Sequence, residues 1–335
     1  MPVSSLHDVA TLAGVSIGTV SNVLNRPEIV AKKTVTRVRS AIDELGYVRN
    51  NAARQLRSGS SRSVGMVVLD VRNPFFTDVA RGAEDELIER SRSLLLANSS
   101  EDRDRELLHL AMFEEQRVDG LLIFPFGDVL GRLEQMRARG IAVVLVDRLA
   151  TSKSFTSVAV DDIHGGRLAT AHLLSLGRRR LAYVGGPLGI EQVKNRHVGA
   201  MAALDEFGAG NLVSYEIETM NASSARALGE AIVALPAVER PEGVFAANDL
   251  IALGLLQAFT RAGVRVPDDI ALIGYDDIEF AASAAIPLSS VRQPARQMGR
   301  RAAQLLLQEI ERGPGWACEH IVFDPELVVR ESTRG

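Results

Sequence analysis

The stretch ATLAGVSIGTVSNVLN, Ala10 to Asn25, decides how the N-terminal end of the chain is interpreted. Apolar residues at helical spacing stop at Gly14, and a second apolar series begins after Ser16. Gly14 suits the left-handed C-cap of a first helix, and the Ser16 hydroxyl can cap the first turn of a second helix. Two short helices joined in this way are typical of a helix-turn-helix, whose second helix enters the DNA major groove. A helical hairpin inside any packed domain would show the same pattern, so both interpretations stay open here.

The residues around this stretch extend the helical pattern. We expect helices at 6–13, 17–24 and 32–45. Three helices this short share one small core and form a compact head, which Gly46 ends. Beyond it, 50–56 has the pattern of a short helix and 59–63 has the composition of a linker. Because so short a helix is marginal in water, we expect 50–56 to be ordered when a partner binds it.

The N-terminal segment is basic and the rest of the chain is acidic. Residues 1–62 hold nine Lys or Arg and four Asp or Glu, a net charge of +5, whereas the remaining residues hold 29 basic and 38 acidic side chains, a net charge of −9. Alone, this difference could be a chance variation of surface charge. Because it coincides with the helical hairpin, it favours a polyanion as the partner of the head.

The composition indicates a globular protein of more than one domain. A length of 335 residues predicts two or three compact units. The sequence holds no run of 18 apolar residues, and its N-terminus lacks the basic and apolar regions of a signal peptide. The one cysteine, Cys318, cannot form an internal disulfide, which fits a reducing compartment. We therefore expect a cytoplasmic protein with no membrane partner.

From Val64 onward the pattern changes to alternating strands and helices. The run VGMVVL, Val64 to Leu69, is typical of a buried parallel strand. Further strands are predicted at 93–97, 120–125, 142–146, 157–160, 181–184, 243–246 and 271–274. Helices are predicted near 78–90, 102–116, 128–138, 163–176, 190–207, 223–235, 248–262 and 294–311. This α/β alternation predicts doubly wound parallel sheets, and the number of strands predicts two similar lobes.

A series of motifs runs along the whole chain. The head carries DVA-x-LAGVS-x-x-TVS-x-VLN, then AIDELGY and N-x-x-AR-x-L. The body carries NPFF, EEQRVDGLLI, VDDIHGGRLA, FAANDLIALG, VPDDIALIGYDD and SSVRQP, in that order. In these motifs the chain resembles bacterial repressors of the lactose-repressor/galactose-repressor (LacI/GalR) family over essentially its whole length. It departs from the family pattern at Arg49, where the family usually has a Pro that pre-sets the turn into the hinge helix.

The resemblance implies a helix-turn-helix head, a hinge helix and a two-lobed core like that of periplasmic sugar-binding proteins. The expected boundaries are 1–49 for the head, 50–63 for the hinge helix and linker, and 64–335 for the core. The N-terminal lobe is then expected at about 64–160 and 292–323, and the C-terminal lobe at about 161–291 and 324–335. The implied partners are a double-stranded, pseudo-palindromic DNA operator and a second copy of the chain. The last residues carry no heptad segment, so we expect a homodimer rather than a tethered tetramer.

The second head helix presents three residues where the family reads bases. Asn22 could pair with adenine, Ile17 could pack on a thymine methyl group, and Gly18 leaves room for a close approach. Ile17 could instead belong to the core of the head. Leu56 matches the family's apolar wedge, which enters the minor groove and kinks the duplex. The expected DNA-binding residues are Ser16, Ile17, Gly18, Thr19, Ser21, Asn22, Asn25, Asn50, Arg54 and Leu56.

Polar and aromatic side chains follow the predicted strands of the body, where open α/β sheets bind ligands. Carboxylates, amides and an Arg beside an aromatic wall are what a carbohydrate site requires. The expected ligand-binding residues are Asp70, Asn73, Phe75, Phe76, Asp147, Arg196, Asn248, Asp276 and Gln293. The Arg at 196 is placed by the resemblance. Asn248 could instead be an N-cap, Asp276 a turn cap and Phe75 a core residue.

Three classes of protein fit the body: a repressor, a dinucleotide-dependent enzyme and a periplasmic solute-binding protein. No G-x-G-x-x-G follows the first strand, and no nucleophile elbow or P-loop is present, which argues against the enzyme. The basic head and the missing signal peptide argue against the solute-binding protein. We therefore expect a repressor that is switched by a small effector and needs no cofactor. A sugar is the family default for this effector, and a nucleobase-type effector is the main exception.

Overall fold

The computed structural model describes residues 4–47, 61–150 and 154–334, without the side chain of Pro314. The chain divides into two compact units, 1–61 and 62–335, and each is described by itself. In the described residues, no helix is long and apolar enough to cross a membrane. The predicted residues Arg49, Asn50, Arg54 and Leu56 lie outside the described part of the chain.

The first unit is a head of three helices around a small apolar core. Its helices are α1 (Leu6–Ala13), α2 (Ile17–Asn25) and α3 (Lys32–Leu45), with a 3-10 turn, η1, at Pro27–Ile29. Gly14 ends α1 with φ of 61°, and the Ser16 hydroxyl accepts the Thr19 N–H at 3.1 Å. Both caps were predicted from the sequence and are confirmed. The buried core side chains are Val9, Ala10, Ala13, Val20, Val23, Val38 and Ala41.

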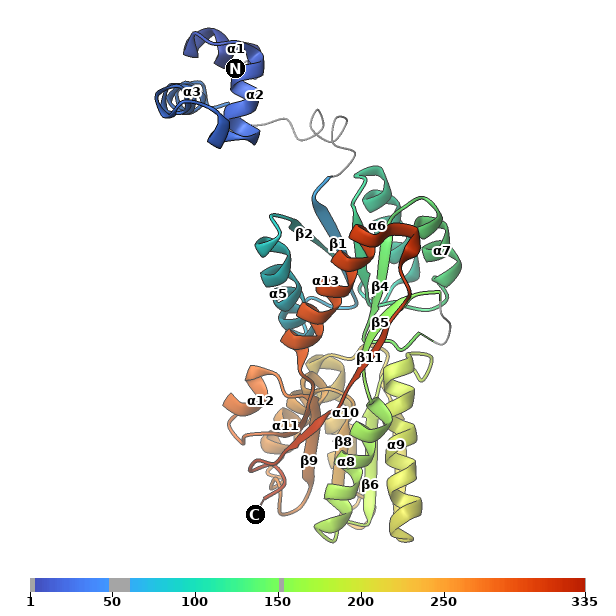
Figure 1. Ribbon diagram of the computed structural model, residues 1–335. Coiled ribbons are helices and arrows are strands. Elements are labelled where there is room, and N and C mark those ends of the chain that lie inside the picture. The colour runs from blue at the N-terminus through green and yellow to red at the C-terminus, as the bar shows by residue number, and fades with distance from the viewer. Residues whose placement is uncertain (1–3, 48–60, 151–153, 335) are drawn as a thin grey trace. The chain divides into compact units, whose positions relative to one another are not determined.

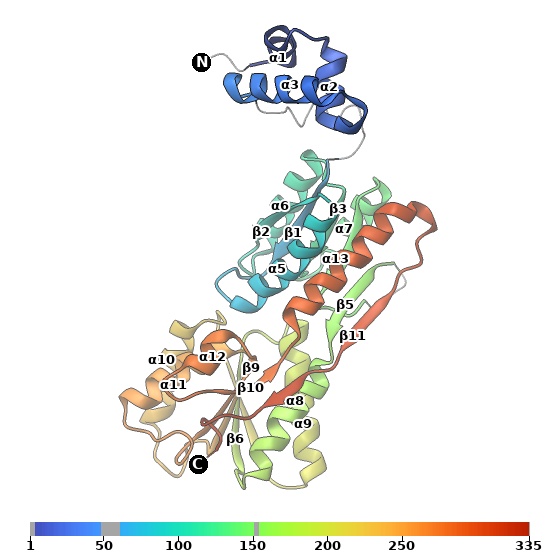
Figure 2. The ribbon, with the colours of Figure 1, turned by 60° about the vertical axis from the view of Figure 1, so that its left-hand side comes forward.

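The second unit holds two six-stranded sheets, one in each lobe (Figures 1 and 2). The N-terminal lobe contains β1 (Ser63–Val68), β2 (Ser93–Asn98), β3 (Gly120–Ile123), β4 (Ala142–Val146), β5 (Thr156–Val160) and β11 (His320–Phe323). Their order is β11-β5-β4-β3-β1-β2, and every pair is parallel. Central strands β3 and β4 are buried throughout, as expected for a sheet covered on both faces.

The sheet of the C-terminal lobe has the same arrangement apart from one edge. It contains β6 (Arg180–Gly185), β7 (Asn211–Glu216), β8 (Gly243–Ala246), β9 (Ala271–Asp276), β10 (Ser289–Arg292) and β12 (Glu326–Val328). Their order is β12-β10-β9-β8-β6-β7, with only the β10–β12 pair antiparallel among the described strands. The chain passes between the lobes after β5, after β10 and after β11. These crossings bring residues far apart in sequence to one cleft.

Helices cover both sheets. The N-terminal lobe carries α5 (Pro74–Glu89), α6 (Arg103–Glu115), α7 (Leu130–Ala138) and α13 (Ala295–Arg312), which η2 (Gly313–Gly315) follows. The C-terminal lobe carries α8 (Asp162–Ser175), α9 (Glu191–Phe207), α10 (Ala222–Ala234), α11 (Asp249–Arg261) and α12 (Glu279–Ser283). The doubly wound architecture predicted from the sequence is confirmed, but β7, β10, β11, β12 and α12 were not predicted. In addition, β1 begins at Ser63, the last residue of the expected linker.

Helices α8 and α9 lie side by side, and two glycines set their separation (Figures 1 and 2). A Cβ atom on Gly166 would lie 2.0 Å from the Arg196 carbonyl oxygen, and one on Gly199 would lie 1.9 Å from the Ile163 carbonyl oxygen. Any larger side chain would force the two helices apart. This close approach matters for the pocket, because α9 carries Arg196 and α8 begins with its ion-pair partner, Asp162.

Candidate functional site

The exposed face of α2 is the candidate DNA-binding surface of the head. Ile17 is 47% exposed and Gly18 and Asn22 are also exposed, while Val20 and Val23 of the same helix are buried. The prediction that Ile17 could be a core residue is therefore wrong. Helical periodicity has separated the buried face of α2 from a face that can enter a groove.

The remaining predicted residues of the head lie beside that face. The hydroxyls of Ser16 and Thr19 form a hydrogen bond at 2.9 Å, so both side chains contribute to the N-terminal cap of α2. The Asn25 amide donates to the Ser21 carbonyl oxygen at 2.9 Å in the last turn. These contacts fix the ends of α2, and Ser16 and Asn25 are exposed while Thr19 and Ser21 are half-buried. Ser and Thr hydroxyls at such positions suit phosphate contacts.

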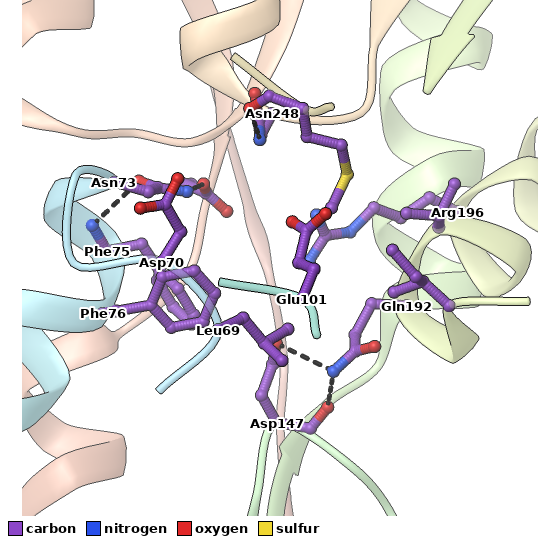
Figure 3. A pocket seen from close by; sticks show the side chains of 14 residues that line it. Leu69, Asp70, Asn73, Phe75, Phe76, Glu101, Asp147, Gln192, Arg196 and Asn248 are labelled. Carbon is purple, nitrogen blue, oxygen red and sulfur yellow. Dashed lines mark hydrogen bonds between the residues drawn. The ribbon is translucent and has the colours of Figure 1, made fainter. Parts of the chain in front are cut away.

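A pocket lies between the two lobes of the core (Figure 3). Eight of the nine predicted ligand-binding residues line it: Asp70, Asn73, Phe75, Phe76, Asp147, Arg196, Asn248 and Asp276. The space inside it, open solvent included, is about 480 Å³. Polar groups that converge beside apolar side chains in a concave site are typical of a small-molecule pocket. Asn73, Phe75 and Phe76 form one side, and Arg196 and Gln192 form the other.

Asp276, the last residue of β9, hydrogen-bonds across the cleft. The Asn73 amide donates to its Oδ2 at 3.0 Å and the Gln293 amide donates to its Oδ1 at 2.8 Å. Gln293, the ninth predicted residue, thus stands behind Asp276 rather than in the lining. Burial raises the pKa of Asp276 to about 6, although Arg196 and the two amides oppose this. Its backbone has φ of 102°, which is strained for any residue but Gly.

Asp147 follows β4 and contacts the other lobe on the opposite side of the pocket. The Gln192 amide of α9 donates to its Oδ2 at 3.2 Å and to its carbonyl oxygen. Its Oδ1 is buried and has no hydrogen-bond partner among the described residues. Burial, and then the neighbouring Asp162 carboxylate, raise the pKa of Asp147 well above its usual range. With φ of 58°, this is a second acid held in left-handed backbone at the pocket.

Arg196 is the buried cation of the pocket. Its Nε donates to Asp162 Oδ1 at 2.8 Å and its Nη1 donates to the Ala247 carbonyl oxygen at 2.7 Å. Its guanidinium carbon lies 3.7 Å from the centroid of the Tyr275 ring. Burial opposes the charge, but Asp162 and the other surrounding groups raise the pKa of Arg196 well above its usual range. Arg196 therefore stays charged in a fixed orientation.

The two phenylalanines form an aromatic wall at the start of α5. The rings of Phe75 and Phe76 lie edge to face at 5.2 Å, and Phe124 packs edge-on against both. Phe75 is 3% exposed, so the core role considered from the sequence is confirmed alongside its place in the lining. This packing fixes the ring positions, and a fixed apolar wall can receive the C–H face of a flat or cyclic ligand.

Asn248 has the capping role considered from the sequence. Its Oδ1 accepts the Ile251 N–H at 2.8 Å at the start of α11, and its amide donates to the Met220 carbonyl oxygen at 3.4 Å. Asp276 was also considered as a turn cap, but its carboxylate instead accepts hydrogen bonds from the side-chain amides of Asn73 and Gln293. Asn248 also lines the pocket. Its capping hydrogen bond therefore fixes the side chain beside the space for the ligand, and the two roles are compatible.

Sequence reasoning missed six lining residues: Leu69, Glu101, Ile190, Gln192, Val193 and Met220. Two of them could have been found. Glu101 comes shortly after β2, at the strand edge where ligands bind, and Gln192 lies one helical turn before Arg196 on α9. The apolar residues carry no such pattern. In the described ranges of the chain, no cluster of His, Cys, Asp or Glu could hold a metal ion.

Comparisons with known proteins agree with this architecture. The family model for bacterial regulatory proteins of the lacI family matches residues 5–50, and that for a periplasmic binding protein-like domain matches residues 170–333. The HTH-type transcriptional repressor PurR of Aliivibrio salmonicida is 33% identical, over 98% of this chain and 98% of its own.

Two solved structures are similar over most of the chain. The lac repressor dimer bound to operator and the anti-inducer ONPF is 26% identical with a TM-score of 0.83, covering 99% of each chain. A LacI family transcriptional regulator from Enterococcus faecium with bound ribose is 28% identical with a TM-score of 0.74. That alignment covers 81% of this chain and 98% of the other.

Proposed function

The chain belongs to the LacI family of bacterial regulatory proteins, and we propose that a small sugar bound between its lobes changes its affinity for operator DNA. Like its relatives, the chain is a DNA-binding transcriptional repressor and not an enzyme. Its core takes a small-molecule effector rather than a catalytic cofactor. The class of that effector is the part that we propose.

The arrangement of the pocket carries this proposal. Carboxylates at Asp147 and Asp276 offer buried acceptors, Arg196 offers a charged donor, and Phe75 and Phe76 offer an apolar wall. A sugar matches all three, because its hydroxyls donate and accept while its ring carbons pack on apolar surface. A hydroxyl donated to the unpartnered Asp147 Oδ1 would also remove the cost of burying that oxygen without a partner.

A nucleobase-type effector is the alternative that the sequence left open. A flat base gains most from stacking between two apolar or aromatic faces. Here the aromatic side chains of the lining come from one segment, Phe75 and Phe76, while the other apolar residues of the lining are aliphatic: Leu69, Ile190, Val193 and Met220. Bound ribose in the Enterococcus faecium relative also supports a sugar.

The contacts across the cleft suggest how a ligand acts on the lobes. Asn73 contacts Asp276 on one side of the pocket and Gln192 contacts Asp147 on the other, each pair joining the two lobes. A sugar that bonds to both carboxylates competes with or adds to these contacts, so it binds the two lobe arrangements with different affinity. Only such a difference can shift the equilibrium between them. In a homodimer, the shift would move the paired heads on a pseudo-palindromic operator.

A thermal-shift screen of the full chain with monosaccharides and nucleosides tests the effector class. A ligand that binds only the folded core stabilises it against unfolding, by about 2.7 kcal/mol when the ligand is present at one hundred times its Kd. This stabilisation appears as a higher melting temperature. We expect one or a few sugars to do so and nucleosides to have no effect. Stabilisation by nucleosides or free bases, with none by sugars, would replace the sugar by the nucleobase class.

Effector affinity should fall as the pH is lowered below about 6. The ionised Asp276 carboxylate is the acceptor for sugar hydroxyls, and burial raises its pKa to about 6. Below that pH the free protein carries the proton, which must leave when the sugar binds, so affinity falls by up to about tenfold per pH unit. Isothermal titration calorimetry at pH 5, 6 and 7 measures this. An unchanged Kd between pH 7 and 5 would show that Asp276 does not accept from the ligand as a carboxylate.

Replacing Asn22 by Ala should weaken operator binding about tenfold or more and relax specificity at one base pair. Asn22 is exposed on α2, where an amide can form two hydrogen bonds with adenine worth about 1–3 kcal/mol of discrimination. Fluorescence anisotropy with operator variants measures the effect. Asp43→Ala, at an exposed residue of α3, is the control. An equal loss on operator and on random DNA would mean that Asn22 contacts only the backbone.

A further inference from the structure

A second cavity adjoins the effector pocket. Its lining includes Asp147, Leu149, Ile163, Gln192, Asn195 and Val322. The space inside it, open solvent included, is about 710 Å³. Asp147 and Gln192 belong to both linings, so their contact forms the wall that the two cavities share. We call this second space the outer cavity.

The outer cavity exposes apolar side chains from three separate segments. Leu149 follows β4, Ile163 lies in the first turn of α8, and Val322 lies in β11, and these side chains are 44%, 45% and 47% exposed. A single exposed apolar residue on a surface needs no explanation. Three that converge on one concave space leave an apolar lining without a covering group, which is typical of a ligand site.

Polar groups alternate with these apolar ones. Arg148 and Glu191 form an ion pair at 3.0 Å that joins the two lobes at the margin of the cavity. The Asn195 side chain is half-buried on α9 and lines the cavity. Asp161 is occupied, because its Oδ1 accepts the His164 N–H at 2.8 Å as the N-cap of α8. The cavity therefore offers an amide, a cation and an anion beside aliphatic surface.

The wall between the cavities is incompletely bonded. The Gln192 amide reaches Asp147 Oδ2 at 3.2 Å, but Asp147 Oδ1 has no partner among the described residues although the residue is only 5% exposed. A buried carboxylate oxygen without a donor is costly, so it marks a place that a ligand hydroxyl would fill. Moving the Gln192 side chain would release its two hydrogen bonds to Asp147, one to Oδ2 and one to the backbone carbonyl oxygen, and would open the wall that the two linings share.

We propose that the outer cavity is a second subsite of the effector pocket, which holds the second sugar ring of a disaccharide effector. This inference rests on the sugar proposal above. The first ring lies against Phe75 and Phe76, and the glycosidic linkage passes the contact between Asp147 and Gln192. The C–H face of the second ring covers Ile163 and its apolar neighbours. Its hydroxyls bond to Asn195 and to the ion pair at the margin.

Calorimetry on the full chain with matched sugars tests this subsite. The probes are glucose and galactose, and the disaccharides maltose, cellobiose and lactose. Ile163→Trp fills the outer cavity, and Val198→Trp places the same side chain at a 43% exposed position of α9 outside its lining. We expect a disaccharide to bind the natural chain at least tenfold more tightly than its monosaccharide units.

The two variants separate the outer cavity from the pocket. Ile163→Trp should bring the disaccharide affinity down to that of the monosaccharide, which itself changes less than twofold, and Val198→Trp should alter neither. A disaccharide that binds no more tightly than its units, or binds Ile163→Trp undiminished, would overturn the subsite and leave a monosaccharide effector standing. If no sugar binds the natural chain, the sugar class fails, and the subsite fails with it.

Discussion

Replacing Arg196 by Lys should lower effector affinity about a hundredfold and remove the effector's influence on operator binding, while operator affinity itself is unchanged. The guanidinium is held in one orientation by Asp162, the Ala247 carbonyl oxygen and the Tyr275 ring. A hydrogen bond from a charged group to a ligand contributes about 1.5–3 kcal/mol. Lys keeps the positive charge beside Asp162 but lacks the planar set of donors, so it should preserve the fold and lose the ligand.

Replacing Arg196 by Ala has a second, structural consequence. It leaves Asp162 buried without its cation, and breaking such a pair typically costs about 3–5 kcal/mol. We therefore expect Arg196→Ala to lower the melting temperature on the order of 10 °C, and Arg196→Lys to lower it much less. Arg167→Ala, which removes an exposed pair with Glu206 on the same helices, is the control and should change neither property. A full effector response in Arg196→Lys would contradict ligand binding by Arg196.

Replacing Leu56 by Ala should weaken operator binding about a hundredfold and leave effector affinity nearly unchanged. The family resemblance makes Leu56 the apolar wedge of the hinge, and inserting such a wedge offsets the cost of unstacking with the contacts that a bent duplex allows. Without the wedge the duplex stays straighter and those contacts are lost. The effector pocket is built from other residues of the chain, so its affinity for sugar is the internal reference.

An exposed apolar residue of the head serves as a matched control for Leu56. Leu12 is 46% exposed on α1, and Leu12→Ala removes the same atoms from a position that the family does not use as the wedge. Anisotropy measurements with operator DNA, at one fixed salt concentration, compare the two variants. Equal operator affinity for Leu56→Ala and the natural chain would show that Leu56 does not act as the wedge.

The head and the sheets could be predicted from the sequence where local patterns are strong. The caps at Gly14 and Ser16 follow from local chemistry, and buried central strands such as β3 and β4 are short apolar runs. Edge strands lack that pattern. In β7 no side chain is fully buried, and β11 is four residues long and pairs with β5 about 160 residues earlier in the chain. Such pairing depends on tertiary contacts that no local window contains.

The site divides in the same way. The rule that ligands bind at strand ends found Asp70, Asp147 and Asp276, because it depends only on where strands finish. It could not show that Asp162 neutralises Arg196, since that contact depends on the glycine-mediated approach of α8 to α9. It also placed Gln293 in the lining, whereas the structure places that amide behind Asp276.

The central claim is that one sugar binds between the lobes and shares an equilibrium with operator binding. The direct measurement is the Kd for operator with and without saturating sugar, together with the Kd for sugar with and without saturating operator. Coupling between two binding sites is reciprocal. We therefore expect saturating sugar to change the Kd for operator, and saturating operator to change the Kd for sugar, by the same factor of about 5- to 150-fold. A sugar that binds the natural chain with one affinity whether or not operator is present would contradict the claim.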